Sequence, residues 1–175
     1  PFAMYHVDPD HKEREFLTLD ELTAMTEIKL EDPNMAFARD LFIFGCWTGI
    51  SFIDIKNLTE DNISMINGAP WIVSKRQKTG VPFQIKLMDI PMQIIGRYKA
   101  FRKGSHLFNI GNLDSINKRI KKVAAMCGIK KRVSFHVSRH SWAVLALEYG
   151  MPIESVSKIL GHTNITTTQI YAKVT

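Results

Sequence analysis

Residues 134–171 read SFHVSRHSWAVLALEYGMPIESVSKILGHTNITTTQIY, and this stretch decides the fold of the chain. Apolar residues recur in it at helical spacing. Two glycines, Gly150 and Gly161, stand where a left-handed C-terminal cap ends a helix. The stretch therefore predicts two helices, over 135–149 and 152–160, and a shorter helical piece over 166–171.

Helical signals also occupy the N-terminal part. The run Thr18-Leu19-Asp20-Glu21 is a capping box, which predicts a helix to about Leu30. A second helix follows Pro33 and runs to Trp47, with an apolar face wide enough to be mostly buried. The remaining predicted helices cover 51–58, 91–101 and 115–127.

Between these helices the apolar period changes from 3.6 to 2. Three strands are predicted over 62–66, 70–74 and 81–87, with Asn67-Gly68 forming a tight hairpin turn. With 175 residues and 45% hydrophobic content, the chain can bury one core. We expect an α+β domain that is mostly α-helical, with a small three-stranded antiparallel sheet.

The charges are segregated along the chain. The net charge is +6, but residues 75–139 hold sixteen Lys or Arg against Asp89 and Asp114, a balance of 16 − 2 = +14. The remainder carries 7 − 15 = −8. Such an asymmetry is either a solvated basic face or the surface that binds nucleic acid, whose phosphates attract basic side chains.

The stretch 134–171 also carries side chains suited to phosphodiester chemistry. His136 and Arg139 stand three residues apart in the first turn of a helix that Ser134 is expected to cap, at the end that favours an anion. A phosphate there could receive a bidentate guanidinium and an imidazole donor. Tyr171 offers a phenol, a nucleophile that leaves a covalent phosphoester.

Two further histidines lie in the same stretch. His162 follows a helix-ending glycine, so it is either a capping residue or, given its place between Arg139 and Tyr171, part of a site. His140 lies a further step round its helix and either packs against neighbours or touches DNA. Cys46 and Cys127 have no Cys or His at metal-ligand spacing, so we expect reduced thiols and no metal.

These motifs resemble those of the tyrosine recombinase, or phage integrase, family. The resemblance rests on His136, Arg139, Leu160-Gly161-His162 and Tyr171, and on two upstream runs. These runs are Thr48-Gly49-Ile50-Ser51-Phe52-Ile53-Asp54-Ile55 and Arg76-Gln77-Lys78-Thr79-Gly80. The sequences of these motifs are most similar to those of integrases of conjugative and mobilizable transposons of Bacteroides-type bacteria.

The resemblance implies a role for each matched residue. Tyr171 would attack the scissile phosphate and give a 3′-phosphotyrosyl link. Arg139 and His162 would hold the nonbridging oxygens, and His136 would assist proton movement. Lys78, on the hairpin loop, would protonate the departing 5′ oxygen. No nucleotide, metal or other cofactor is required, because the phosphotyrosine conserves the bond energy.

One position departs from the family pattern. The family places an arginine directly after Thr-Gly-Leu/Ile, and this chain has Ser51, which can donate one hydrogen bond to DNA but brings no charge. We expect Arg39, which lies inside an apolar helix, to supply the missing guanidinium. The alternative is that Arg39 forms a salt bridge to Asp40, Asp54 or another acid. Arg76 is the second candidate for the missing guanidinium, and if it does not take that role we expect it to contact DNA. Asp54 is expected to brace Arg139 or a histidine.

The expected function is that of a recombinase catalytic domain over residues 16–175, preceded by a linker over 1–15 from an absent upstream DNA-binding domain. The alternatives are a DNA-binding or architectural domain with weakened catalysis, and a type IB topoisomerase-like enzyme. The expected partner is double-stranded DNA at attachment sites, bound by a homo-tetramer of the full-length protein. The isolated domain is expected to be a monomer. We expect a bacterial cytoplasmic, nucleoid-associated protein without a membrane span, because the longest apolar run, Leu41 to Trp47, is too short to cross a bilayer.

Overall fold

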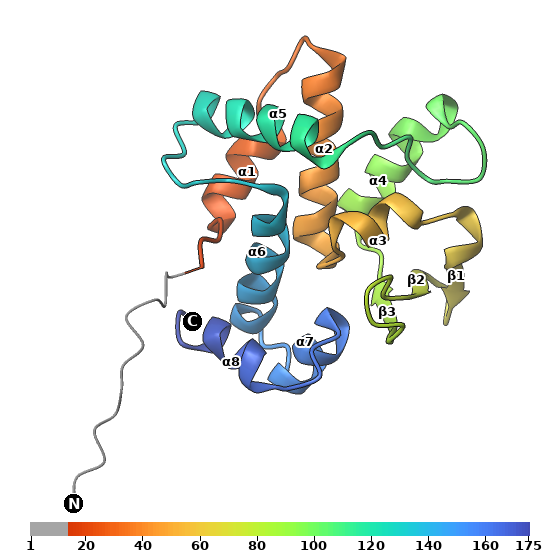
Figure 1. Cartoon of the computed structure of the whole chain (residues 1–175), viewed down its shortest axis with the longest axis vertical. Coiled ribbons are helices and arrows are strands. Elements are labelled where there is room, and N and C mark those ends of the chain that lie inside the picture. Colours follow the sequence, from red (N-terminus) through yellow and green to blue (C-terminus); the bar gives the residue numbers. More distant parts are fainter. Residues whose placement is uncertain (1–13) are drawn as a thin grey trace, which may run out of the picture.

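Eight α-helices and one three-stranded antiparallel sheet make up residues 14–175, the part of the chain that the computed structural model describes (Figure 1). The predicted fold class is confirmed. The helices are α1 (Leu19–Glu27), α2 (Pro33–Thr48), α3 (Phe52–Asn57), α4 (Asp89–Tyr98), α5 (Leu113–Met126), α6 (Phe135–Glu148), α7 (Ile153–Leu160) and α8 (Thr166–Ala172). Short 3₁₀ turns lie at Glu60–Asn62 and Lys99–Phe101.

The sheet has the order β1-β2-β3, with β1 (Ile63–Ile66), β2 (Ala69–Lys75) and β3 (Pro82–Lys86). Asn67 and Gly68 both have positive φ, 50° and 76°, which a two-residue hairpin turn requires and which this residue pair adopts readily. In the second hairpin Lys75 pairs with Pro82, so the loop from Arg76 to Val81 projects from the end of the sheet. This loop carries two of the expected site residues.

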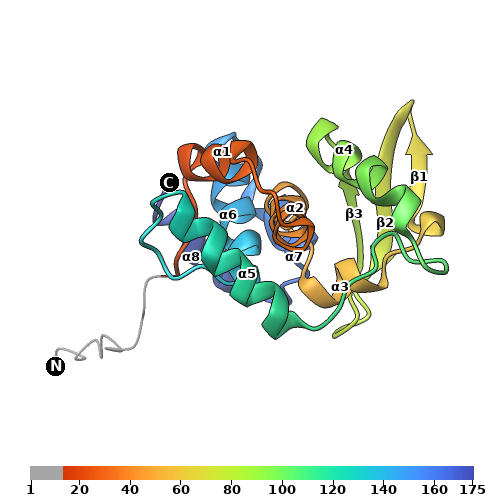
Figure 2. The same ribbon diagram turned by 90° about the horizontal axis from the view of Figure 1, so that it is seen from above.

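Helix α2 is the centre of the helical part. It contacts α1, α4, α5 and α6, and its residues from Ala38 to Cys46 are all buried. Gly45 allows a close approach of α6, because a Cβ at this position would lie 2.5 Å from Ser138 Oγ. Figure 2 shows the sheet and α4 on one side of α2, and α1, α5 and α6 on the other.

Several helix boundaries differ from the expectation, two of them for a clear physical reason. Helix α1 ends at Glu27, three residues early, and the guanidinium of Arg39 binds the carbonyl oxygens of Met25 and Thr26, which a further turn would use, together with that of Ile28. Helix α4 begins at Asp89 instead of Pro91, since a proline is tolerated in a first turn, where its missing N–H has no helical partner.

The expected linker over residues 1–15 lies outside the described residues except for Arg14 and Glu15, which pack against the domain. Within residues 14–175, no helix is long and apolar enough to span a bilayer.

Candidate active site

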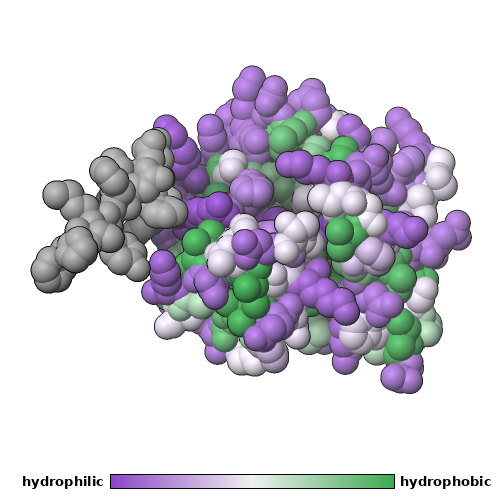
Figure 3. All heavy atoms as spheres, turned by 60° about the horizontal axis from the view of Figure 1, so that its bottom comes forward, coloured by the Kyte–Doolittle hydropathy of each residue, from purple (hydrophilic) through white to green (hydrophobic). Residues whose placement is uncertain are grey.

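Most of the expected site residues lie where five segments meet. These are the first half of α6, the end of α7, helix α8, the second hairpin and the turn between α2 and α3. Figure 3 brings forward the end of the molecule that holds α7 and α8. Hydrophilic residues surround this face, and apolar residues form separate small patches on it.

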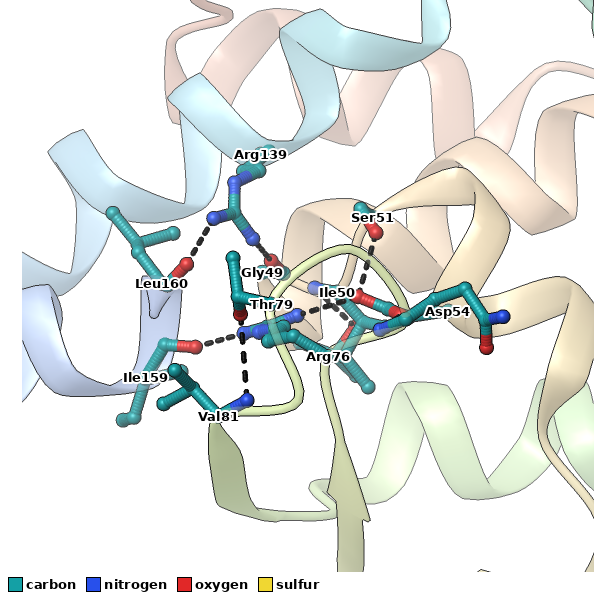
Figure 4. A network of polar contacts seen from close by, with 12 residues as sticks. Gly49, Ile50, Ser51, Asp54, Arg76, Thr79, Val81, Arg139, Ile159 and Leu160 are labelled. Carbon is teal, nitrogen blue, oxygen red and sulfur yellow. Dashed lines mark hydrogen bonds and ion pairs between the residues drawn. The ribbon is translucent and has the colours of Figure 1, made fainter. Parts of the chain in front are cut away.

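Arg139 is held by backbone carbonyls from two other helices. Its guanidinium donates to the Gly49 carbonyl at 3.0 Å, at the end of α2, and to the Leu160 carbonyl at the end of α7 (Figure 4). Burial lowers the pKa of Arg139 to about 10, and the nearby charge of Arg76 adds to this effect. Arg139 stays charged at neutral pH, and an anion would relieve the repulsion between the two guanidiniums.

Arg76 follows the last residue of β2 and is 5% exposed. Its guanidinium lies 4.0 Å from the centre of the Phe83 ring, bonds Asp54 Oδ2 at 3.3 Å, and donates to the Ile159 carbonyl. Its Nε atom is buried and has no hydrogen-bond partner in the part of the chain that the structure describes. Figure 4 shows Arg76 and Arg139 reaching the same end of α7 from different sides.

Gly161 provides the space for Arg76. It ends α7 with φ of +70°, as the sequence predicted, and a Cβ there would lie 3.1 Å from Arg76 Cγ. The glycine therefore both caps the helix and admits the arginine.

Asp54 organises the region around Ser51. Its carboxylate accepts from the Ser51 hydroxyl at 2.7 Å and from the Gln77 backbone amide at 2.7 Å, in addition to Arg76. This corrects the expectation that Asp54 bonds Arg139 or a histidine, because within residues 14–175 its carboxylate bonds Ser51 and the hairpin instead. Ser51 is half-buried, and its hydroxyl is engaged by this carboxylate.

Arg39 lies elsewhere, which corrects the expectation that it replaces the missing arginine. Its Nε bonds Asp40 Oδ1 at 2.6 Å, and its Nη1 donates to the carbonyls at the end of α1. Asp40 also accepts from Arg97 and from the hydroxyl of Tyr98. Arg39 therefore belongs to a buried network between α1, α2 and α4, and the hydrogen bonds it makes in the described structure go to none of the other expected site residues.

His136 and His140 lie on one face of α6 in an edge-to-face arrangement, with ring centres 4.5 Å apart. His136 is exposed, whereas His140 is only 7% exposed, which favours the packing role of His140 over a contact with DNA. His140 Nδ1 lies 3.2 Å from the Glu15 carbonyl oxygen, which can only accept, so this nitrogen carries the proton. Burial, followed by the charge of His136, lowers the pKa of His140 to about 4.

Ser134 precedes α6 but makes no side-chain cap bond, contrary to the expected capping. The amide of Phe135 donates instead to the side-chain oxygen of Asn117 at 2.7 Å. The first-turn position of His136 is unchanged. Although the side chain is exposed, desolvation by the surrounding protein atoms lowers the pKa of His136, with smaller contributions from Arg139 and Arg14.

His162 is oriented by a residue that the sequence analysis missed. His162 Nδ1 lies 2.7 Å from the hydroxyl oxygen of Thr168, which is fully buried on α8. Thr168 stands three residues before Tyr171, so the two share one face of α8. The three-residue spacing from Tyr171 could have identified Thr168 in the sequence, but three neighbouring threonines made it one of several equivalent candidates. Burial, then Arg139, lowers the pKa of His162 to about 4.

Tyr171 lies on α8 with its side chain packed inward. It is 4% exposed, its ring centre is 5.6 Å from that of His140, and its hydroxyl accepts a hydrogen bond from Arg14 at 3.4 Å. Tyr171 lies close enough to Arg139 to raise the pKa of that guanidinium, against the larger lowering by burial and by Arg76.

Lys78 lies at the edge of the site. It is exposed on the loop of the second hairpin, and the neighbouring Gln77 contacts Asn57 at 3.3 Å. The described structure thus gathers Arg76, Arg139, His162 and Tyr171 around the ends of α7 and α8, with Lys78 at the edge. Two guanidiniums balanced by one carboxylate leave excess positive charge, which suits a phosphate.

The sequence model of the phage integrase family matches residues 15–175. The chain is 27% identical over 164 residues to tyrosine recombinase XerC of Neisseria meningitidis serogroup B, covering 87% of this chain and 54% of that protein. It is 47% identical over 180 aligned positions to XerC of Natranaerobius thermophilus, covering 94% of this chain and 60% of that protein. The chain therefore spans little more than half the length of these relatives.

Solved structures share the fold. The XerA recombinase crystal structure matches with a TM-score of 0.74 at 24% identity, covering 93% of this chain and 60% of that chain. XerH bound to palindromic difH substrate matches with a TM-score of 0.77 at 19% identity, covering 93% and 50%. The Tn1549 transposon integrase in complex with circular intermediate DNA matches with a TM-score of 0.72 at 19% identity, covering 94% and 62%.

Proposed function

The chain belongs to the phage integrase family, and from this premise we propose that residues 16–175 are the catalytic domain of a site-specific DNA recombinase. The domain cleaves and rejoins DNA strands through a 3′-phosphotyrosyl intermediate, in the integration and excision of a mobile element. The observation that carries this proposal is the pair of guanidiniums, Arg76 and Arg139, on neighbouring carbonyls close to Tyr171. Such a set can bind a phosphodiester and attack it.

In the cleavage step the phenolic oxygen of Tyr171 attacks the scissile phosphorus. The bond from phosphorus to the tyrosine oxygen forms as the bond from phosphorus to the 5′ oxygen breaks. His136 assists removal of the phenolic proton, and Lys78 supplies a proton to the departing 5′ oxygen. One phosphate ester replaces another, so attack by the 5′ hydroxyl of a partner strand reverses the step without an external energy source.

The nonbridging oxygens are held by Arg139, His162 and Arg76. Arg76 takes the place of the arginine that the family has at Ser51, since its guanidinium bonds the same Asp54 that accepts from the Ser51 hydroxyl. Both arginines bring charge-assisted donors to the site where negative charge develops in the transition state. Asp54 positions Arg76 and the hairpin.

The partner is double-stranded DNA at attachment sites, in the bacterial cytoplasm and its nucleoid. Sixteen Lys or Arg against two acids over residues 75–139 support this partner, because phosphates attract such a surface. The Tn1549 transposon integrase, which shares the fold, is described in complex with circular intermediate DNA, and XerH is described bound to palindromic difH substrate. The full-length protein acts as a homo-tetramer on DNA, and the domain by itself is a monomer.

A second candidate function is DNA binding without cleavage. The serine at position 51 favours it, because the position has lost a charged phosphate contact. The two functions differ in one observable, the covalent protein–DNA adduct.

The test uses a labelled pool of nicked duplexes with randomised sequence around the nick, incubated with the chain and separated under denaturing conditions. A recombinase domain forms a labelled adduct, and Tyr171→Phe forms none while it still binds DNA. Sequencing of the captured strands gives the preferred site. Binding without any adduct leaves the second candidate, and an adduct that persists in Tyr171→Phe reassigns the nucleophile.

A further inference from the structure

The segment 14–17 precedes α1, and each of its residues contacts the rest of the domain. The Leu17 amide donates to Ser141 Oγ at 2.8 Å, and Lys131 Nζ donates to the Phe16 carbonyl at 2.9 Å. Phe16 also lies under the Lys131 ammonium, 5.3 Å from ring centre to nitrogen. These contacts fix the path of the chain toward α8.

The next two residues reach the site itself. The Glu15 carboxylate accepts from the Arg132 amide at 3.1 Å, and the Glu15 carbonyl accepts from His140 Nδ1 at 3.2 Å. Arg14 then donates from Nη1 to the hydroxyl of Tyr171 at 3.4 Å. His140 and Arg14 thus approach Tyr171 from its ring and from its oxygen.

The charge of Arg14 acts on the whole group of side chains. Together with burial and Arg139, it contributes to the lowered pKa of His136, His140 and His162. The hydrogen bond from Arg14 to Tyr171 is long, at 3.4 Å, so it contributes less as a bond than through charge and direction. The guanidinium places a positive charge next to the phenolic oxygen and orients the phenol.

We propose that Arg14 is a positioning residue for Tyr171: its guanidinium orients the phenolic oxygen and favours the negative charge that develops there as the proton leaves. This inference rests on the proposed function. None of the motifs that carry the family resemblance includes Arg14, and it lies far from Tyr171 in sequence. A preorganised cation at the attacking oxygen lowers the barrier without reorganising during the reaction.

The first test needs no DNA. The Tyr171 resonance in a chain labelled with ¹³C at tyrosine Cζ is assigned through Tyr171→Phe. Arg14→Ala should shift this resonance clearly. Arg132→Ala, which removes an exposed arginine of the same charge beside the segment, should leave it in place. An unmoved resonance in Arg14→Ala overturns the proposal, whatever the catalytic result.

The second test measures the rate of adduct formation at saturating nicked DNA. Arg14→Ala should slow capture on the order of tenfold, with DNA affinity equal to that of Arg132→Ala. Arg14→Lys and added methylguanidinium should each restore part of the rate, because both return a cation to the oxygen. A rate for Arg14→Ala equal to or faster than that of Arg132→Ala overturns the proposal.

The two tests distinguish a failure of the role proposed for Arg14 from a failure of the proposed recombinase function. A parent chain that forms no adduct overturns the proposed function, and the Tyr171 resonance then decides on Arg14 by itself. Far-ultraviolet circular dichroism of each variant verifies that the fold is retained.

Discussion

Arg76 and Arg139 donate hydrogen bonds to the carbonyl oxygens of two consecutive residues, Ile159 and Leu160, at the end of α7. One guanidinium arrives from the end of β2 and the other from α6. The C-terminal end of a helix carries partial negative charge, which offsets part of the repulsion between the two arginines. A phosphate can also offset this repulsion, since its oxygens can accept hydrogen bonds from both arginines.

Replacing Arg76 should lower the rate of catalysis through the loss of a phosphate contact and not through a loss of stability. Arg76→Ala should slow adduct formation by about 100-fold, the order seen when a preorganised donor to developing charge is lost. Arg76→Lys should recover little, because lysine lacks the forked donor geometry. The measurement is the capture rate on nicked DNA at saturating protein.

The matched control is Arg39→Ala, which breaks a buried ion pair away from the site. It should lower the free energy of unfolding by about 2 kcal/mol, since Asp40 keeps only Arg97 and Tyr98 as partners. Its capture rate per folded molecule should match that of the parent. A capture loss in Arg39→Ala as large as that in Arg76→Ala would reject the assignment of Arg76.

Moving the guanidinium back to position 51 should restore part of the lost rate. In the double variant Ser51→Arg with Arg76→Ala, the new arginine can bond Asp54, the carboxylate that Ser51 and Arg76 both contact. We expect capture at least tenfold faster than in Arg76→Ala alone. The same rates in the single and double variants would show that the pocket accepts a guanidinium only from the hairpin.

The Thr168 hydroxyl should matter for the orientation of His162. Thr168→Val keeps the branched shape and removes the hydrogen bond of 2.7 Å. We expect capture to fall about tenfold with unchanged DNA affinity, because the imidazole loses its fixed orientation. Thr167→Val, at an exposed neighbouring position, is the control. Equal rates for these two valine variants would exclude a role for Thr168.

Stability should fall as the pH is lowered below neutrality. The pKa of His140 is about 4 in the folded chain against 6.5 for the free side chain. Between these values the unfolded state binds more protons, so the stabilisation present above pH 6.5 is lost as the pH falls toward 4. His140→Gln should reduce the loss between pH 7 and pH 5 by on the order of 1 to 2 kcal/mol.

Urea unfolding at the two pH values measures this difference. His106→Gln, at an exposed position, is the control and should leave it unchanged. The same pH dependence in the parent and in His140→Gln would show that this histidine is not held neutral by the fold.

Local patterns predicted most of the elements correctly. The Asn67-Gly68 turn, the alternation in β3 and the glycine that ends α7 each follow from constraints within a few residues. Side-chain partners were harder to predict. An arginine inside the apolar helix α2 indicated an anionic partner. The sequence offered Asp40 as one such partner of Arg39 but could not choose between this acid, another acid and a phosphate at the site.

The sequence by itself determined the element order, the fold class and the set of residue types capable of phosphodiester chemistry, because periodicity, caps and turn residues act over short distances. Only the tertiary structure decided which side chains meet. It joined Arg76 to Asp54 beside Ser51, His162 to Thr168, and Arg14 to Tyr171. Such contacts depend on how helices and hairpins pack, and packing is set by the whole core instead of by any local run of residues.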